Sequence, residues 1–274
     1  GQMMKLLLEE EGFAVVLRPD LTPMALRAGM QSGEVDLSAE YTGTAWMIHL
    51  KQKYTPGTGS SALYEKVKEA EKENGFIWLQ PIWNNNTYGL ASWPDFVSEH
   101  GLKTLSDLAR LYRSKAGKIQ TFINFEFSAR PDGLHALEEI YDFDIARSHL
   151  KTVTPGVSVL GLEQHEARVA MVFGTDPTIP QHNWHLYPDD KSAFPPYDLT
   201  PYIRREVLEK YPQIRDILGR LTASFPGGGK PASSAVVADC RKVWQKLNAR
   251  VDVEREDPEK VALSYLLEHE LVKN

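Results

Sequence analysis

Segments with a strand pattern alternate with segments with a helix pattern over the first third of the chain, and this alternation limits the possible folds. The β-rich runs are 13–19 (FAVVLRP), 34–41 (EVDLSAEY) and 76–83 (FIWLQPIW). A helix pattern between the first two begins at Thr22-Pro23, an N-cap followed by proline, and ends at Gly33. Strands that alternate with helices predict an α/β fold with a largely parallel sheet.

A second α/β unit begins near Asn84. Its main predicted elements are a helix over 104–114, a strand over 118–127, a helix over 134–143 and a strand over 166–176. From residue 205 to the end, the sequence shows helix patterns and no further strand pattern. The chain therefore predicts two α/β lobes, one formed by 1–83 plus 195–274 and one inserted at 84–194. The two crossings, near 84–86 and 189–194, predict a hinge of the kind that closes around ligands.

Composition excludes several functions. The 274 residues fit about two domains, and a formal net charge of -6 argues against a nucleic-acid partner. No run approaches the roughly 20 apolar residues of a membrane-spanning helix. Cys240 is the single cysteine, which excludes an intrachain disulfide and a cysteine metal cluster. Its surroundings, VVADCRKVW, have a helix pattern, so we expect a packed thiol.

The stretch SAEYTGTAW (38–46) places Tyr41 at a strand end, directly before a helix start. Unpaired N–H groups at a helix start suit a carboxylate, and the face of an aromatic ring attracts a cation. One element could therefore bind both ends of a zwitterion. The alternative is an ordinary strand-end tyrosine followed by an ordinary helix cap.

Three other stretches add aromatic residues at strand ends or crossings. Tyr88 lies in NNNTYGLA, Phe173 in MVFGTDPTI, and Tyr197 in DDKSAFPPYDLTP, behind two prolines that stiffen the loop. Ligands of open α/β sheets bind beyond the carboxyl ends of the strands. Together with Tyr41, these residues predict an aromatic cage of the type that binds quaternary ammonium groups.

The motifs GEVDLSAEYTGTAW, NNNTYGLA, EFSARPDGLHALEEIYDF and DDKSAFPPYDLTP resemble the glycine betaine/choline/carnitine-binding family of ABC-transporter substrate-binding proteins. They occur in the family's order and spacing over nearly the whole chain. The resemblance implies a bilobal, type II-like periplasmic-binding-protein fold. It also implies a cage formed by Tyr41, Tyr88, Phe173 and Tyr197.

Three further ligand-binding residues follow from the resemblance. Thr44 matches a position that contacts the polar end of the ligand. Arg130 matches an arginine that pairs with a ligand carboxylate in some relatives, a role that suits the guanidinium fork. The alternative role for Arg130 is a salt bridge to Asp132 or Glu126. Asn86 is a candidate for lending a backbone carbonyl to the ammonium methyl groups.

The chain departs from the family pattern in two respects. Phe173 stands where the family usually has tyrosine, so the ring face is kept and a hydroxyl is lost. The chain also opens in a helix pattern, GQMMKLLLEEEGF, and we expect the family's first strand to be missing before it.

Other signals are weaker. PGGGKPAS lacks a phosphate loop's first glycine and has Pro231 where that loop has serine or threonine. His182, His185 and His165 have no spacing that demands zinc. No two acidic residues stand out as a catalytic pair. We therefore expect no metal, no cofactor and no catalysis.

The predicted function is capture of a quaternary ammonium osmolyte, such as glycine betaine or choline, for an ABC importer. The expected partners are this solute and a membrane permease, with the protein a monomer. The expected location is periplasmic, or extracellular with a membrane anchor, directed by a signal or lipoprotein segment outside this chain. A ligand-sensing domain of the same fold and an enzyme using the interlobe cleft are the alternatives.

Overall fold

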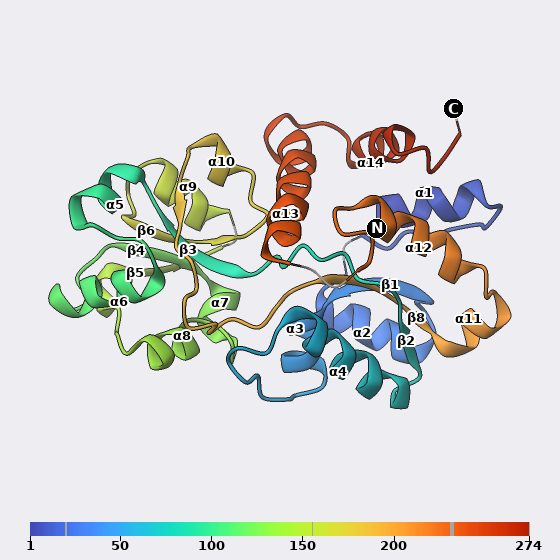
Figure 1. Cartoon of the computed structure of the whole chain (residues 1–274), viewed down its shortest axis with the longest axis horizontal. Coiled ribbons are helices and arrows are strands. Elements are labelled where there is room, and N and C mark those ends of the chain that lie inside the picture. Colours follow the sequence, from blue (N-terminus) through green and yellow to red (C-terminus); the bar gives the residue numbers. More distant parts are fainter. Residues whose placement is uncertain (20, 155, 231–232, 274) are drawn as a thin grey trace. The chain divides into compact units, whose positions relative to one another are not determined.

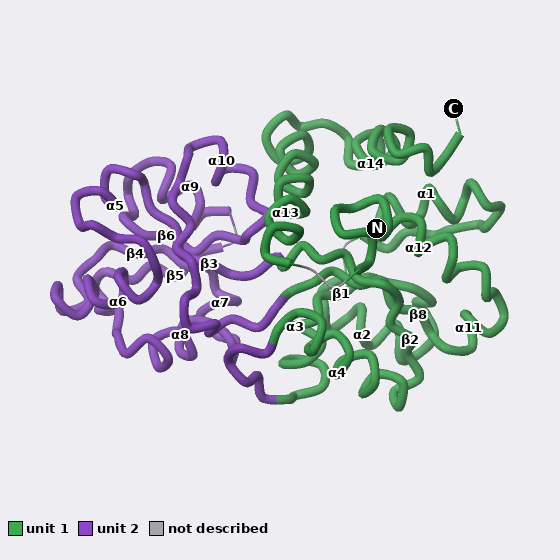
Figure 2. Tube along the Cα trace, in the orientation of Figure 1, with its two compact units in different colours: residues 1–52, 59–85, 197–274 green, residues 53–58, 86–196 purple. Residues whose placement is uncertain are grey.

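A computed structural model describes residues 1–19, 21–154, 156–230 and 233–273. Pro231 and Ala232 of the PGGGKPAS stretch therefore lie outside it. It divides the chain into two compact units (Figure 2). Unit 1 comprises 1–52, 59–85 and 197–274, and unit 2 comprises 53–58 and 86–196. The sequence pattern predicts an inserted lobe at 84–194. No pattern in the sequence assigns residues 53–58 to this lobe.

The sheet of unit 1 has three strands in the order β1 (Leu37–Tyr41), β8 (Leu199–Arg204) and β2 (Phe76–Trp78). β8 pairs antiparallel with both neighbours, so the prediction of a largely parallel sheet is wrong here. The reason is that β8, which follows the inserted unit in the sequence, enters between two strands of the first third. Such an order depends on long-range pairing.

The segment 13–19, predicted as a strand, forms none among the described residues. Its alternating side chains do fit a strand, because Phe13 and Val15 pack against the apolar core. The backbone lacks a neighbouring ladder in the described part of the chain, and a strand is defined by that ladder.

Helices cover both faces of the unit 1 sheet (Figure 1). The core on one face joins α1 (Gln2–Glu10), α12 (Ile214–Ser224), α13 (Ser234–Asn248) and α14 (Pro258–Glu268). The core on the other face joins α2 (Pro23–Ser32) and α4 (Ser60–Glu73). The shorter helices of this unit are α3 (Thr42–Thr44), the π-helix η1 (Ala45–His49), α11 (Arg205–Lys210) and the π-helix η3 (Ala249–Val253).

Local signals fix several helix ends. The Thr22 hydroxyl accepts the Ala25 N–H, and Gly33 takes the left-handed conformation after α2, as predicted. Thr104 forms a capping box with Asp107 at the start of α6 (Leu105–Ser114), which confirms the predicted start. Ser60 is the first residue of α4, and Gly59 holds the N-cap position.

The described residues of unit 2 form a mixed sheet of five strands. Their order is β5 (Leu150–Val153), β4 (Thr121–Asn124), β6 (Val169–Phe173), β3 (Tyr88–Ser92) and β7 (His185–Leu186). β4 runs parallel to β5 and β6, whereas β3 is antiparallel to β6 and β7.

The helices of unit 2 follow the alternation expected from the sequence. Besides α6 they are α5 (Pro94–His100), α7 (Phe125–Ala129), α8 (Leu134–Tyr141), the 3-10 helix η2 (Arg147–His149), α9 (Val157–Glu163) and α10 (Thr178–Gln181). Gly161 allows α9 to pack closely on the sheet. A Cβ at this position would lie 2.3 Å from the Phe122 ring. Among the described helices, none has the length and apolarity needed to cross a membrane.

Candidate functional site

Aromatic rings gather around Tyr88 in unit 2. Tyr88 opens β3 and lies directly opposite Phe173, the last residue of β6, in the antiparallel ladder. Their ring centroids are 5.2 Å apart. The Phe127 ring lies at the same distance from Tyr88, and the Phe194 ring lies 6.4 Å away. The register of β3 against β6 therefore builds this ring cluster at one end of the sheet.

Arg130 belongs to the same cluster. Its guanidinium carbon lies 5.5 Å from the centroid of the Tyr88 ring. Nε and Nη2 each donate to a carboxylate oxygen of Asp132 at 2.8 Å, and Nη1 donates to Glu126 at 3.2 Å. The salt bridge that the sequence left as an alternative is thus present. Whether Arg130 also binds a ligand stays a prediction.

A tight turn brings Arg130 to this position. The Gly133 N–H donates to the Arg130 carbonyl at 3.0 Å. A Cβ at Gly133 would lie 1.9 Å from the Phe127 carbonyl oxygen, a distance at which atoms overlap. The glycine of the ARPDG motif therefore lets the loop after α7 fold back beside the ring cluster.

Asn86 joins the beginning of β3 to the loop after β6. Its side-chain oxygen accepts hydrogen bonds from the Thr175 hydroxyl at 2.8 Å and from the Thr175 N–H at 3.3 Å. The Gly174 N–H donates to the Thr87 carbonyl at 2.9 Å. The Asn86 side chain thus helps to hold Tyr88 beside Phe173.

Unit 1 positions the other predicted residues. Tyr41 ends β1, and its N–H donates to the Glu40 carboxylate at 2.7 Å. The second oxygen of that carboxylate lies 3.1 Å from the His49 Nε2. Thr42, Gly43 and Thr44 are buried. The Thr42 N–H donates to the Asp198 carbonyl at 3.1 Å, so the helix start expected to be bare is partly occupied.

Tyr197 lies two residues before β8 and is buried. Its N–H donates to the Asn85 side-chain oxygen at 2.9 Å, and the Leu199 N–H donates to the Asn84 side-chain oxygen at 3.0 Å. Tyr41 pairs with Leu199 in the β1–β8 ladder. The two tyrosines of unit 1 therefore lie on neighbouring segments of one sheet.

The structure thus gathers the predicted residues into two groups, one in each unit. Sequence reasoning missed Phe127 and Phe194 of the ring cluster, and it missed Asp198. Phe194 had a usable signal, since it directly precedes the two prolines before Tyr197. Phe127 is the last residue of the predicted strand 118–127, and only the fold, which places it in α7, brings it against Tyr88.

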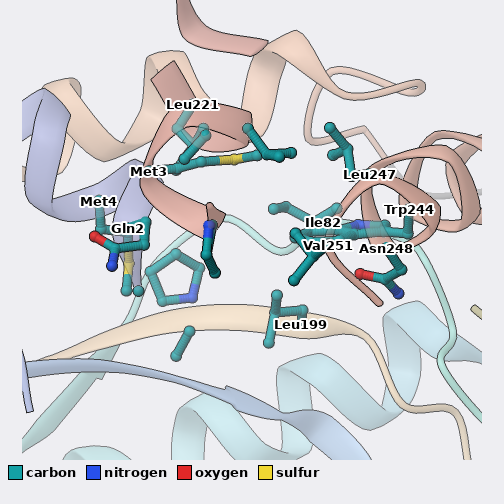
Figure 3. A pocket seen from close by; sticks show the side chains of 16 residues that line it. Gln2, Met3, Met4, Ile82, Leu199, Leu221, Trp244, Leu247, Asn248 and Val251 are labelled. Carbon is teal, nitrogen blue, oxygen red and sulfur yellow. The ribbon is translucent and has the colours of Figure 1, made fainter. Parts of the chain in front are cut away.

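A separate cavity of about 190 Å³ lies within unit 1 (Figure 3). Met3, Ile82, Leu221, Trp244 and Leu247 are among the residues that line it. The described residues around it include no charged side chain and none of the predicted site residues. This hollow is therefore not the predicted cage.

The histidines considered for zinc have other contacts. His182 Nε2 lies 3.0 Å from a Glu163 carboxylate oxygen, and His185 Nε2 lies 3.0 Å from the Lys103 carbonyl. The described residues contain no group of three or more histidine, cysteine, aspartate or glutamate side chains able to hold a metal. Burial raises the pKa of the Cys240 thiol to about 12, as expected of a packed cysteine.

An α/β unit inserted into another, with aromatic residues at strand ends in each, defines the class of periplasmic binding proteins. Within this class, the family described as the substrate-binding domain of ABC-type glycine betaine transport systems matches residues 1–268. The chain belongs to this family.

Individual relatives agree with this assignment. The glycine-betaine-binding protein of Pseudomonas aeruginosa is 30% identical over 97% of this chain and 82% of its own length. The glycine betaine-binding protein YehZ of Escherichia coli is 31% identical, over 97% of this chain and 85% of its own. The solved structure of apo YehZ matches with a TM-score of 0.70, 28% identity, and coverage of 99% of this chain and 94% of that chain.

The family assignment decides among the alternatives left open by the sequence. The chain is a substrate-binding protein of an ABC importer for quaternary ammonium compounds such as glycine betaine. It is a non-enzymatic component of a transport system. The enzyme alternative is therefore dropped, and transport is favoured over sensing.

Proposed function

We propose that this protein binds the quaternary ammonium group of its solute in an aromatic cage formed by Tyr41, Tyr88, Phe173 and Tyr197. The observation that carries the proposal is the cross-strand pair of Tyr88 and Phe173, with its ring centroids 5.2 Å apart at the end of a sheet. A permanently methylated nitrogen has no N–H to donate. Ring faces can therefore replace its water shell without leaving a hydrogen bond unmade.

The polar end of the solute has its own candidate partners. Thr44 supplies a hydroxyl close to the helix start, and Gly43 allows close approach to the backbone. Arg130 would bind a carboxylate with the Nη1–Nη2 edge of its guanidinium, while Asp132 holds the Nε–Nη2 edge. Asn86 would contribute its backbone carbonyl to the methyl groups.

Tyr41 and Tyr197 belong to unit 1, whereas Tyr88 and Phe173 belong to unit 2. The monomeric protein would deliver the solute to its permease from the periplasm or the outer cell surface.

Calorimetric titration with glycine betaine, choline, carnitine and proline betaine tests the proposal. We expect Tyr88→Ala and Tyr197→Ala each to weaken binding at least ten-fold, about 1.4 kcal/mol or more. Tyr211→Ala is the matched control, because Tyr211 lies partly exposed against Phe13 in unit 1. Unchanged affinity in both cage variants would refute the cage.

A neutral ligand of the same shape separates a cation site from an apolar one. In 3,3-dimethylbutan-1-ol a carbon atom replaces the nitrogen of choline. Binding as tight as that of choline would contradict a role for the ring faces in cation recognition. We expect the neutral compound to bind at least ten-fold more weakly, about 1.4 kcal/mol.

A further inference from the structure

Asp198 is a fully buried carboxylate next to Tyr197 in unit 1. Its backbone forms two hydrogen bonds with Thr42, the residue after Tyr41. The Asp198 N–H donates to the Thr42 hydroxyl, and the Thr42 N–H donates to the Asp198 carbonyl, each at 3.1 Å. This pair of bonds joins the segment that follows Tyr41 to the segment that contains Tyr197.

The side chain of Asp198 makes a second connection. Its Oδ1 accepts the N–H of Asn85 at 3.0 Å. The Asn85 side-chain oxygen in turn accepts the Tyr197 N–H at 2.9 Å. Asn85 has a φ of 36°, in the left-handed region that asparagine tolerates better than most residues. Asp198 therefore stabilises the unusual backbone conformation of Asn85, and the Asn85 side chain in turn binds the backbone of Tyr197.

Arg241 of α13 completes this arrangement. Its Nε and Nη2 donate to the Asn85 carbonyl at 3.0 and 2.7 Å, and Nε also lies 3.2 Å from the Asn84 carbonyl. Burial lowers the pKa of the Arg241 guanidinium, and the negative charge of Asp198 opposes this effect. The buried Asp198 and the partly buried Arg241 thus stabilise each other's charge across residues 84–85.

We propose that Asp198 is a positioning residue for the quaternary ammonium site. It fixes the segments that carry Tyr41 and Tyr197 through Thr42 and Asn85, with Arg241 as its counter-charge. The link to the ligand rests on the proposed function, whereas the hydrogen-bond network is a property of unit 1 alone.

The position of Asp198 makes ligand binding depend on pH. Burial raises the pKa of its carboxyl to about 6, although the Ser60 hydroxyl, the Asn85 N–H and the Arg241 charge each lower it. Ser60 lies on α4 and Arg241 on α13, whereas Asn85 lies before β3. The Cys240 thiol of α13 is neutral below its raised pKa. Below about pH 6 the carboxyl gains a proton, weakening its bond to Asn85 and leaving Arg241 without a counter-charge.

Two substitutions separate the roles of shape and charge. Asp198→Asn keeps a side-chain oxygen for the Asn85 N–H and removes the charge, whereas Asp198→Ala removes both. For choline and glycine betaine at pH 7.5, we expect Asp198→Ala to weaken binding at least ten-fold and Asp198→Asn about three-fold. The wild-type affinity should fall several-fold from pH 7.5 to pH 5, and the Asp198→Asn affinity should not.

Asp239→Asn is the matched control, because Asp239 is an exposed aspartate on α13 and should keep the wild-type pH dependence. Wild-type affinity in Asp198→Ala, or an unchanged pH dependence in Asp198→Asn, would overturn the proposal. If Asp198→Ala does not fold, Thr42→Val provides a second variant, since it removes the hydroxyl that accepts the Asp198 N–H. We expect Thr42→Val to weaken binding at least three-fold, and wild-type affinity in this variant would also overturn the proposal.

Amide hydrogen exchange of the ligand-free protein tests the network independently of the ligand. We expect Asp198→Asn to raise exchange at Asn85 several-fold, with wild-type exchange kept in Asp239→Asn. Unchanged exchange would refute the network even if ligands bind. Raised exchange in a protein that binds neither choline nor glycine betaine would instead leave the network standing and refute the proposed function.

Discussion

Arg130 and Asp132 are joined by two hydrogen bonds of 2.8 Å, Nε to Oδ1 and Nη2 to Oδ2, and both side chains are buried. Paired bonds of this kind fix the plane of a guanidinium as well as its position. The plane fixed here lies beside the Tyr88 ring. Asp132 also balances the arginine's charge, so the two residues together add little net charge to the ring cluster.

Replacing Arg130 with alanine should weaken glycine betaine binding more than choline binding, because only glycine betaine carries a carboxylate. We expect at least a ten-fold difference between the two losses, about 1.4 kcal/mol. Calorimetric titration of both ligands against both proteins measures it. Arg130→Lys is a useful comparison, since it keeps the charge and loses the fork. Equal losses would leave Arg130 with only the structural role shown by its pair with Asp132.

Phe173→Leu should reduce the affinity for quaternary ammonium ligands while keeping an apolar side chain of similar size. A cation–π contact contributes about 0.5–2 kcal/mol, so the expected loss is between two-fold and thirty-fold. Phe173→Tyr is the control, because it keeps the ring face and should bind within about three-fold of the wild type. If leucine and tyrosine variants bind equally well, the ring at position 173 does not contact the cation.

The sequence predicts elements better than it predicts their pairing. Thr22, Gly33 and Thr104 mark helix ends through local hydrogen bonds or backbone conformation, and the structure has all three. The entry of β8 between β1 and β2 depends on residues more than a hundred positions apart. Local patterns contain no information on that order, which explains why the predicted parallel sheet is wrong for unit 1.

The same distinction holds for the candidate site. Tyr88 and Phe173 could be predicted to lie at strand ends, but their direct pairing follows from the β3–β6 register. The contact between Arg130 and Asp132 could be named only as an alternative, because side-chain direction decides it. Asp198 had no signal at all, since its importance comes from burial against Thr42 and Asn85.

A buried ion pair in unit 1 gives a stability prediction. Arg27 Nη1 lies 2.9 Å from Glu71 Oε2, and Glu71 is fully buried. Glu71→Ala should lower the free energy of unfolding by about 3–5 kcal/mol, because it leaves the arginine charge buried and unbalanced. The double variant Arg27→Met/Glu71→Leu should recover most of this loss. Urea unfolding measures both, and equal stability of the single and double variants would contradict the electrostatic explanation.

Gly133→Ala should disturb the ring cluster without changing any ring. The added Cβ would lie 1.9 Å from the Phe127 carbonyl oxygen, so the loop that carries Arg130 must move. Because this loop places the guanidinium beside Tyr88, we expect at least ten-fold weaker glycine betaine binding and about 1–3 kcal/mol lower stability. Gly219→Ala is the control, since a Cβ there meets no atom within 4 Å and alanine favours the helix. Wild-type binding by a folded Gly133→Ala protein would show that the position of the Arg130 loop does not matter for the ligand.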